Sequence, residues 1–327
     1  MRPVANQKTR RSCVRHLGYL NSLQRINKEN KEYRLVSRIQ FIIAGFCYKL
    51  LQLTRSSQKA RLSDLAVFAD DDLGLRLSCF GEFETEILTY LRELFGSNLA
   101  ETHFIDVGAN IGNHTIGLHD HFHKCHAFEP DPRTFRLLKA NTADRPNIIC
   151  HKTALSDQDG ISAFSQHRTN SGKSHIVHPP QPQSPSVRQS LIDVETSRLD
   201  NTSSASEPVS FIKIDVEGHE LEVLKGAQKL LTTQMPMILL ELLATDIRSH
   251  RAASLDFLEE IGYTRFHSVQ PGYMQIAALA KLPSLRWINH IVLGMDILIR
   301  GRQRVKLTKL DVSYLKSKNY EAIFVRR

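Results

Sequence analysis

The regular alternation of strand and helix signals from about residue 80 onward is the feature that most restricts the fold of this chain. Short apolar runs of strand length alternate with segments in which apolar residues recur at helical spacing. Strands are predicted at 103–107, 124–128, 147–152, 192–196, 209–216, 237–242 and 320–325, and helices at 82–95, 112–121, 131–141, 217–231 and 254–261. This rhythm predicts an α/β fold: a doubly wound, mainly parallel, Rossmann-like sheet with helices on both faces.

The length of 327 residues accommodates one large α/β domain and an extension. We therefore divide the chain into an N-terminal helical arm (1–79) and one domain (80–327). Inside that domain, residues 165–208 are rich in Ser, Pro and Gln and predict a loop-rich insertion. The apolar and basic stretch within 280–315 is compatible with a substrate lid, a membrane-contacting segment or ordinary packing.

The net charge of +9 comes from the arm, because residues 1–62 hold 14 of the 43 Lys and Arg but only two of the 34 acids. Such an arm attracts anions. Two interpretations of it are therefore kept: a solvated helical face, or peripheral contact with the inner membrane surface. Nucleic acid is not expected as a partner, because stacking aromatics are not interleaved with the charges. The apolar run at 39–53 is short for a membrane span.

The five cysteines form no CxxC pair and are read as reduced thiols, so we expect a cytoplasmic protein.

A glycine-containing turn follows the predicted strand at 103–107. Gly108 and Gly112 flank Ala-Asn-Ile and open a helix, so the backbone there can come close to a ligand. The glycines are not spaced as GxGxxG, which counts against a dinucleotide as the ligand. The turn also lacks the Gly-Lys-Ser/Thr ending of a P-loop, which counts against a nucleoside triphosphate. Asp106 places a carboxylate at the strand end, which suits the sulfonium and ammonium groups of S-adenosylmethionine.

Acidic and polar residues follow the next two predicted strands. Glu129 ends the second strand, where a carboxylate can accept two hydrogen bonds from a ribose diol. Residues Ala154–Asp157, which include Ser156, follow the third strand and are expected to lie near an adenine. For Asp106 or Glu129 taken alone, simple helix capping is the competing interpretation.

The strand predicted at 209–216 carries the residues expected to act on an acceptor. We assign catalytic roles to Lys213, Asp215, Glu217 and His219, with His219 as the candidate base because its unperturbed pKa lies near 6.5. Asp215, Glu217 and Glu241 could together hold a magnesium ion, but capping of the following helix competes with that interpretation. No metal ligand is therefore assigned, and a divalent metal is not expected to be required.

Four histidines lie close together in the sequence at positions 119, 121, 123 and 126. Their alternate spacing could hold a metal on a strand, but they fall at a predicted helix end and its connection. We expect them to form a solvated surface cluster.

Three segments of the sequence carry a family resemblance. They are Phe104–Gly112 (FIDVGANIG), Ala127–Asp131 (AFEPD) and Phe211–Gly226 (FIKIDVEGHELEVLKG). Together they make residues 80–327 resemble the FkbM-family methyltransferases, and the third segment is the most specific. The resemblance implies a class I methyltransferase fold, S-adenosylmethionine as methyl donor, and a hydroxyl acceptor on a small molecule, sugar or glycan.

The resemblance and the residue patterns together define one candidate cofactor set: Asp106, Gly108, Asn110, Gly112, Asn113, Glu129, Ser156 and Asp157. Two rival functions stay open at this point. One is a non-catalytic, membrane-associated binding module on the same fold, and the other is a nicotinamide-dependent oxidoreductase.

Overall fold

The computed structural model describes residues 42, 45, 46, 49, 65–71, 73, 74, 77, 81–96, 99–177, 189–242, 253–270, 306–309 and 320–326. The chain divides into two compact units, 1–59 and 60–327. Most of the predicted arm (1–79), most of the apolar run at 39–53 and most of the 280–315 segment lie outside the described residues. Of the cysteines, the structure describes Cys125 and Cys150, which are free thiols.

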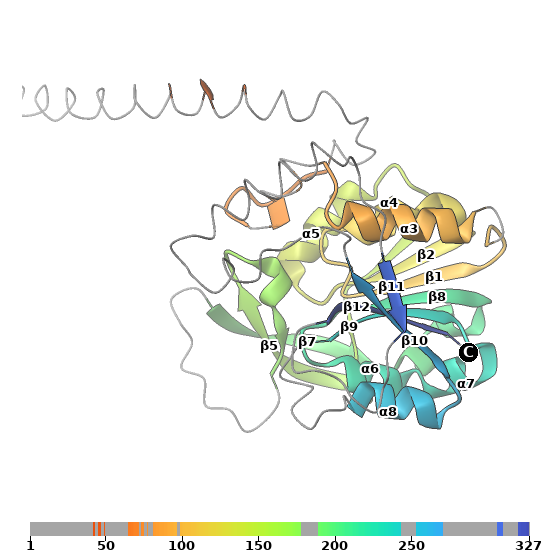
Figure 1. Cartoon of the computed structure of the whole chain (residues 1–327). Helices are drawn as coiled ribbons and strands as arrows, with labels where there is room; N and C mark the ends of the chain where they lie inside the picture. Colours follow the sequence, from red (N-terminus) through yellow and green to blue (C-terminus); the bar gives the residue numbers. More distant parts are fainter. Residues whose placement is uncertain are drawn as a thin grey trace, which may run out of the picture. The chain divides into compact units, whose positions relative to one another are not determined.

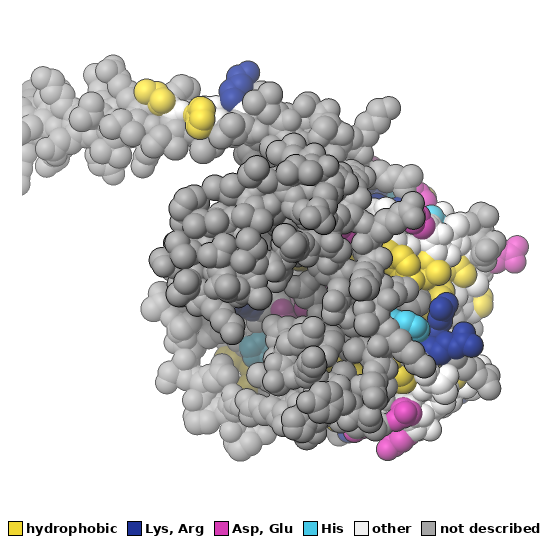
Figure 2. Space-filling view, in the orientation of Figure 1, with side chains coloured by type: hydrophobic (Ala, Val, Ile, Leu, Met, Phe, Trp, Pro, Cys, Tyr) yellow, Lys and Arg dark blue, Asp and Glu magenta, His cyan; other side chains and the backbone are white. Residues whose placement is uncertain are grey.

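In the first unit, the described positions belong to a helix. Ile42 and Phe46, four residues apart, are 69% and 65% exposed, and Figure 2 shows hydrophobic side chains at the surface of this unit. Among the described residues of the chain, no helix combines the length and the apolar character that a membrane crossing needs.

The second unit is built on an eight-stranded sheet of order β11-β10-β12-β9-β8-β1-β2-β3. Its strands are β1 (His103–Val107), β2 (Lys124–Phe128), β3 (Ile148–His151), β8 (Val209–Ile214), β9 (Met237–Leu242), β10 (Arg265–Gln270), β11 (Lys306–Lys309) and β12 (Tyr320–Arg326). The five strands from β3 to β9 pair in parallel, whereas β12 is antiparallel to both β9 and β10, and β11 is antiparallel to β10. The predicted mainly parallel α/β sheet is confirmed.

Helices cover both faces of this sheet, as predicted (Figure 1). One face carries α3 (Thr85–Phe95), α4 (Asn113–Leu118) and α5 (Pro132–Asn141), and the other carries α6 (Glu220–Gly226), α7 (Gln228–Gln234) and α8 (Ala253–Glu260). Alternate residues of each strand enter the two cores: Phe104 packs under α3 and α4, whereas Ile105 packs under α6 and α8. Strands buried on both faces are typical of a parallel sheet.

The insertion predicted as loop-rich is more regular than expected. It contributes to a second sheet of order β4-β7-β5-β6, with β4 (Ala154–Leu155), β5 (Gly160–His167), β6 (His175–Ile176) and β7 (Gln189–Ser197). Short 3₁₀ helices accompany it at η2 (Ser171–Lys173), η3 (Leu199–Asn201) and η4 (Ser203–Ser206), besides η1 (His119–His121) after α4. Phe164, Ile176 and Val194 bury a small core of their own. Such a core needs only a few alternating apolar positions. Because most residues of the insertion are Ser, Pro and Gln, these few positions did not stand out as strands in the sequence.

The single helix predicted at 217–231 is divided into α6 and α7 at Ala227. Gly226 lies against the backbone of Ser156, where an added Cβ would stand 1.9 Å from the carbonyl oxygen. The helix begins at Glu220 rather than at Glu217, because Glu217 and Gly218 have left-handed φ values of 56° and 101°. The Glu220 carboxylate accepts hydrogen bonds from Val216 and Gly218, so it closes this turn.

Candidate functional site

A pocket with an empty volume of about 580 Å³ opens at the carboxyl ends of β1, β2 and β8. In open α/β sheets this edge, where the strand order reverses, is the usual place for a ligand. Its lining consists of Val107, Gly108, Asn110, Phe128, Glu129, Pro130, Thr153, Ala154, Leu155, Phe164, Ser171, Gly172, Ser174, Ile176, Asp215, Val216, Glu217 and His219. The structure therefore brings together six of the predicted site residues: Gly108, Asn110, Glu129, Asp215, Glu217 and His219.

The turn after β1 is held tightly against the neighbouring strand. Gly108 has φ 75°, and a Cβ there would lie 1.9 Å from the carbonyl oxygen of Asp215. Asn110 also adopts a left-handed conformation, with φ 52°. The peptide groups of this turn thus border the pocket directly, and at Gly108 no other residue fits without moving the backbone.

Gly112 and Asn113, which were predicted to bind the cofactor, stand behind the turn and outside the pocket lining. A Cβ on Gly112 would come within 3.0 Å of Leu138. The Asn113 side chain accepts a hydrogen bond from the Phe83 amide and donates one to the Phe83 carbonyl. Both residues therefore shape the turn from outside the pocket.

Glu129 is the buried acid of the pocket, with only 7% of its surface exposed. One carboxylate oxygen accepts from the Asn110 amide at 3.0 Å, and the other accepts from the Asp131 amide at 2.9 Å. Burial nevertheless raises the pKa of Glu129 to about 8. Each oxygen has a second lone pair, so the carboxylate can still accept from a ligand hydroxyl.

Asp106 and Lys213 lie under the turn and not in the pocket lining. Asp106 is fully buried, and its Oδ2 accepts a hydrogen bond from Thr115 at 2.6 Å. Lys213 Nζ lies 3.8 Å from Asp106 Oδ1, 3.0 Å from Asp215 Oδ2 and 3.2 Å from the Gly108 carbonyl oxygen. Burial alone would lower the pKa of Lys213, but the two carboxylates raise it well above its usual value. Lys213 thus stays charged and links the turn to Asp215.

Two further acids stand near Asp215. Burial and the Asp215 carboxylate raise the pKa of Glu217 to about 7. Burial and the same carboxylate raise the pKa of Glu241 to about 10. Among the described residues, the side chains whose ligand atoms lie close enough together to hold a metal ion are His103, His126 and Glu207. Asp215, Glu217 and Glu241 do not form such a group.

His219 lines the pocket and is 5% exposed. Its Nε2 is 2.9 Å from the Ser156 hydroxyl oxygen, and its Nδ1 is 3.7 Å from a Glu222 carboxylate oxygen. The Ser156 hydroxyl in turn donates to Asp157 at 3.3 Å. Ser156 and Asp157 are outside the pocket lining, whereas Ala154 and Leu155 just before them belong to it. The Ser156 hydroxyl contacts His219.

Sequence reasoning missed two groups of pocket residues. Apolar side chains of Phe128, Phe164 and Ile176 belong to the lining, and Phe164 lies on β5 and Ile176 on β6. Ser171 donates from its hydroxyl to Asp71 at 2.5 Å and to Asn110 at 3.3 Å. These residues lie far from the glycine turn in sequence, so periodicity gave no sign of their meeting.

The four histidines expected to form a solvated surface cluster do not all lie at the surface. His126 belongs to β2 and is 2% exposed, whereas His119 and His121 belong to η1. The earlier prediction was wrong for His126, because the sequence showed only local spacing and not the partners that three other segments bring to it.

Comparison with known proteins agrees with this geometry. Residues 106–264 match the family model described as the Methyltransferase FkbM domain. The chain is 33% identical over 122 residues to the hexuronic acid methyltransferase AglP of Haloferax volcanii, which covers 37% of this chain and 48% of that protein. The chain thus spans about half the length of this curated relative.

Solved structures give weaker likenesses of fold. Methyltransferase FkbM from Methylobacillus flagellatus KT aligns with a TM-score of 0.38 and 18% identity over 63% of this chain and 52% of that one. An O-methyltransferase from Thermotoga maritima aligns with a TM-score of 0.33 and 10% identity over 74% of this chain and 64% of that one. The family match lies in the sequence itself: residues 106–264, which include every predicted site residue, match the FkbM methyltransferase domain.

Proposed function

We propose that this protein transfers a methyl group from S-adenosylmethionine to a hydroxyl oxygen of a sugar, glycan or similar small molecule. The observation that carries the proposal is the pocket itself. The residues that can hold the donor (Gly108, Asn110 and Glu129) line the same pocket as those that can act on an acceptor (Asp215, Glu217 and His219). The family match over 106–264 and the methyltransferase relative support the same activity.

The pocket fits the donor on its own chemistry. Glu129 offers carboxylate lone pairs to the ribose diol, and the Gly108 peptide lies close enough to contact the amino-acid part of the donor. The apolar wall of Phe128 and Leu155 suits the adenine ring. When bound, the donor supplies an already activated methyl group on a positively charged sulfur.

The chain must then place the acceptor oxygen in line with that methyl and take up the hydroxyl proton. Glu217 is well suited to take the proton, because it lines the pocket and its pKa of about 7 is near working pH. Its left-handed backbone, with φ 56°, is the kind of strain that often marks a functional residue. His219, the base predicted from sequence, is held by Ser156 and remains the alternative proton acceptor.

A hydroxyl-rich acceptor agrees with the charges on this side of the pocket. Asp215 and Glu217 can accept hydrogen bonds from neighbouring hydroxyls, and Lys213 neutralises part of their charge. The named activity of the relative, a hexuronic acid methyltransferase, is consistent with an acceptor of the sugar class.

The test has two stages. Calorimetric titration with S-adenosylhomocysteine should show binding by the wild type, strong weakening in Glu129→Ala, and no change in Glu195→Ala, whose side chain is exposed on β7. Incubation with S-adenosylmethionine and a panel of hexosides and hexuronosides should then add one methyl group to a hydroxyl, as read by mass spectrometry. A folded wild type that binds no S-adenosylhomocysteine would overturn the proposal and favour a non-catalytic module.

A further inference from the structure

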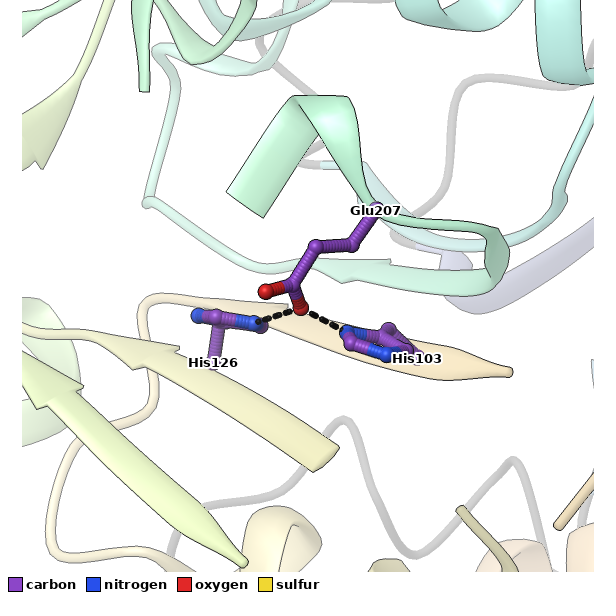
Figure 3. A group of neighbouring side chains, drawn as sticks. All are labelled: His103, His126 and Glu207. Carbon is purple, nitrogen blue, oxygen red and sulfur yellow. Dashed lines mark hydrogen bonds and ion pairs between the residues drawn. The ribbon is translucent and has the colours of Figure 1, made fainter. Parts of the chain in front are cut away.

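A second group of side chains with metal-binding chemistry lies away from the pocket. It consists of His103, His126 and Glu207, which we call the His–Glu cluster (Figure 3). His103 begins β1, His126 lies within β2, and Glu207 precedes β8. None of the three lines the pocket. Val107 at the pocket lies four positions after His103 along β1, a distance of about 13 Å in an extended strand.

The ligand atoms of the cluster lie close together. One atom from each residue lies within 4.8 Å of the other two. His103 Nδ1 forms an ion pair with Glu207 Oε2, and His126 Nε2 lies 3.1 Å from the same oxygen. Figure 3 shows the two imidazoles approaching this oxygen from neighbouring strands. Two ring nitrogens and one carboxylate are thus already gathered, although they come from three separate parts of the sequence.

Both imidazoles of the cluster are buried, with 4% and 2% of their residue surfaces exposed. The Glu207 side chain is 29% exposed, so an ion and a water molecule have access from solvent.

A fourth residue fixes the orientation of His126. His126 Nδ1 lies 3.2 Å from His151 Nε2, and the His151 ring stacks on Phe128 with a centroid distance of 4.3 Å. If Nδ1 carries the proton and donates it to His151, the lone pair of His126 Nε2 points at Glu207. A partner that fixes the tautomer of a ligating histidine in this way is typical of metal sites.

We propose that the His–Glu cluster binds a divalent transition-metal ion of the zinc class, with its remaining coordination position open to water. Two imidazoles and one carboxylate form a ligand set that zinc uses, whereas magnesium and calcium prefer oxygen ligands. The ion would join β1, β2 and the segment before β8 at the amino ends of the strands. Its role is to stabilise the fold, because a metal that binds the native state alone shifts the folding equilibrium.

Lys124 is the feature that opposes binding, and it gives the proposal a sharp test. Its Nζ lies 3.0 Å from the second oxygen of Glu207, so it competes with a cation for the carboxylate. Removing this charge should tighten metal binding. A purely structural Lys–Glu–His network predicts instead that Lys124→Met loosens the segment and creates no metal affinity.

The experiment uses the full chain, stripped with a chelator and titrated with Zn²⁺ against a chromophoric competitor. We expect one equivalent to bind to the wild type and to His121→Gln, whose histidine lies outside the cluster. We expect affinity at least about tenfold weaker in His103→Gln and His126→Gln, and tighter in Lys124→Met. Zn²⁺ should raise the thermal unfolding temperature of the wild type and of His121→Gln, in which the cluster is intact. It should not raise that of His103→Gln or His126→Gln.

A second measurement keeps the proposal testable if a histidine variant fails to fold. Co²⁺ bound to the wild type should give the intense visible bands of a four-coordinate site. Weak bands of the hydrated ion, or equal Zn²⁺ binding by wild type and folded cluster variants, would overturn the proposal. Titration with S-adenosylhomocysteine should be unchanged in every variant, so loss of that binding would concern the pocket and not the metal site.

Discussion

Replacement of Glu129 by glutamine tests the electrostatics of the pocket directly. Burial raises the pKa of this carboxyl from 4.5 to about 8. At about 1.4 kcal/mol for each pH unit, ionisation costs the ligand-free fold about 5 kcal/mol in full. Because the folded pKa is raised, this contribution to stability is present below pH 4.5 and is lost as pH rises through about 8.

Glutamine removes the titration but keeps the shape. Its amide can accept from only one of the two backbone donors, Asn110 and Asp131, so the variant carries a constant cost of about 1–3 kcal/mol. Between pH 5 and pH 8.5 the free energy of unfolding of the wild type should fall relative to Glu129→Gln by about 4 kcal/mol. Other groups that titrate in this range cancel in the difference between the two proteins.

The assay is urea unfolding of both proteins at several pH values without ligand, beside Glu195→Gln as a control with an exposed carboxylate. A difference that stays constant within about 0.5 kcal/mol from pH 5 to 8.5 would refute the reasoning. At pH 8, S-adenosylhomocysteine should bind Glu129→Gln about 10- to 150-fold more weakly than wild type, because one acceptor for the ribose diol is lost. Unchanged affinity would remove Glu129 from the donor site.

Three further changes test other parts of the site, and Gly96→Ala outside it serves as the control for the first. Gly108→Ala should lower the free energy of unfolding by about 2–4 kcal/mol and abolish S-adenosylhomocysteine binding, since its Cβ would meet the backbone at 1.9 Å. Gly96→Ala, at φ 53° with nothing within 4 Å, should cost only about 1 kcal/mol in the same urea assay. Lys213→Met should cost about 3–5 kcal/mol, and adding Asp106→Asn should recover part of it in thermal unfolding, whereas additive losses would contradict their pairing. Glu217→Gln should lower kcat about 10²- to 10⁴-fold and remove a rise in activity near pH 7, and a retained pH profile would point to His219 instead.

The sheet and most of its helices could be predicted because their apolar periodicity is local. The strand at 103–107 and the helix at 254–261 agree with β1 and α8 to within one residue. The break in the helix predicted at 217–231 could not be seen, because it depends on Gly226 meeting the backbone of Ser156, 70 residues earlier. The strand predicted at 192–196 is found within β7, but its pairing with β5 in a second sheet was missed, because the residues between the two strands have a composition typical of a loop.

The site was predictable where the strand ends carry it. Glu129 and Asp215 border the pocket because parallel strands bring their carboxyl ends to one edge. Asp106 was expected to face a ligand, but its strand position turns it under the glycine turn, where it pairs with Lys213. Neither its full burial nor the meeting of His103, His126 and Glu207 follows from spacing, because both depend on the register of neighbouring strands.

The two glycine contacts have a consequence for how this pocket can change. Gly108 lies against the main chain of Asp215, and Gly226 lies against the main chain of Ser156, so main-chain contacts hold the glycine turn against the end of β8 and hold α6 against the end of β4. The second sheet lines the pocket with side chains instead: Phe164 on β5 and Ile176 on β6, which also pack together in the small core. We expect paired, volume-conserving exchanges at these two positions to reshape that part of the pocket and leave the donor-binding turn in place.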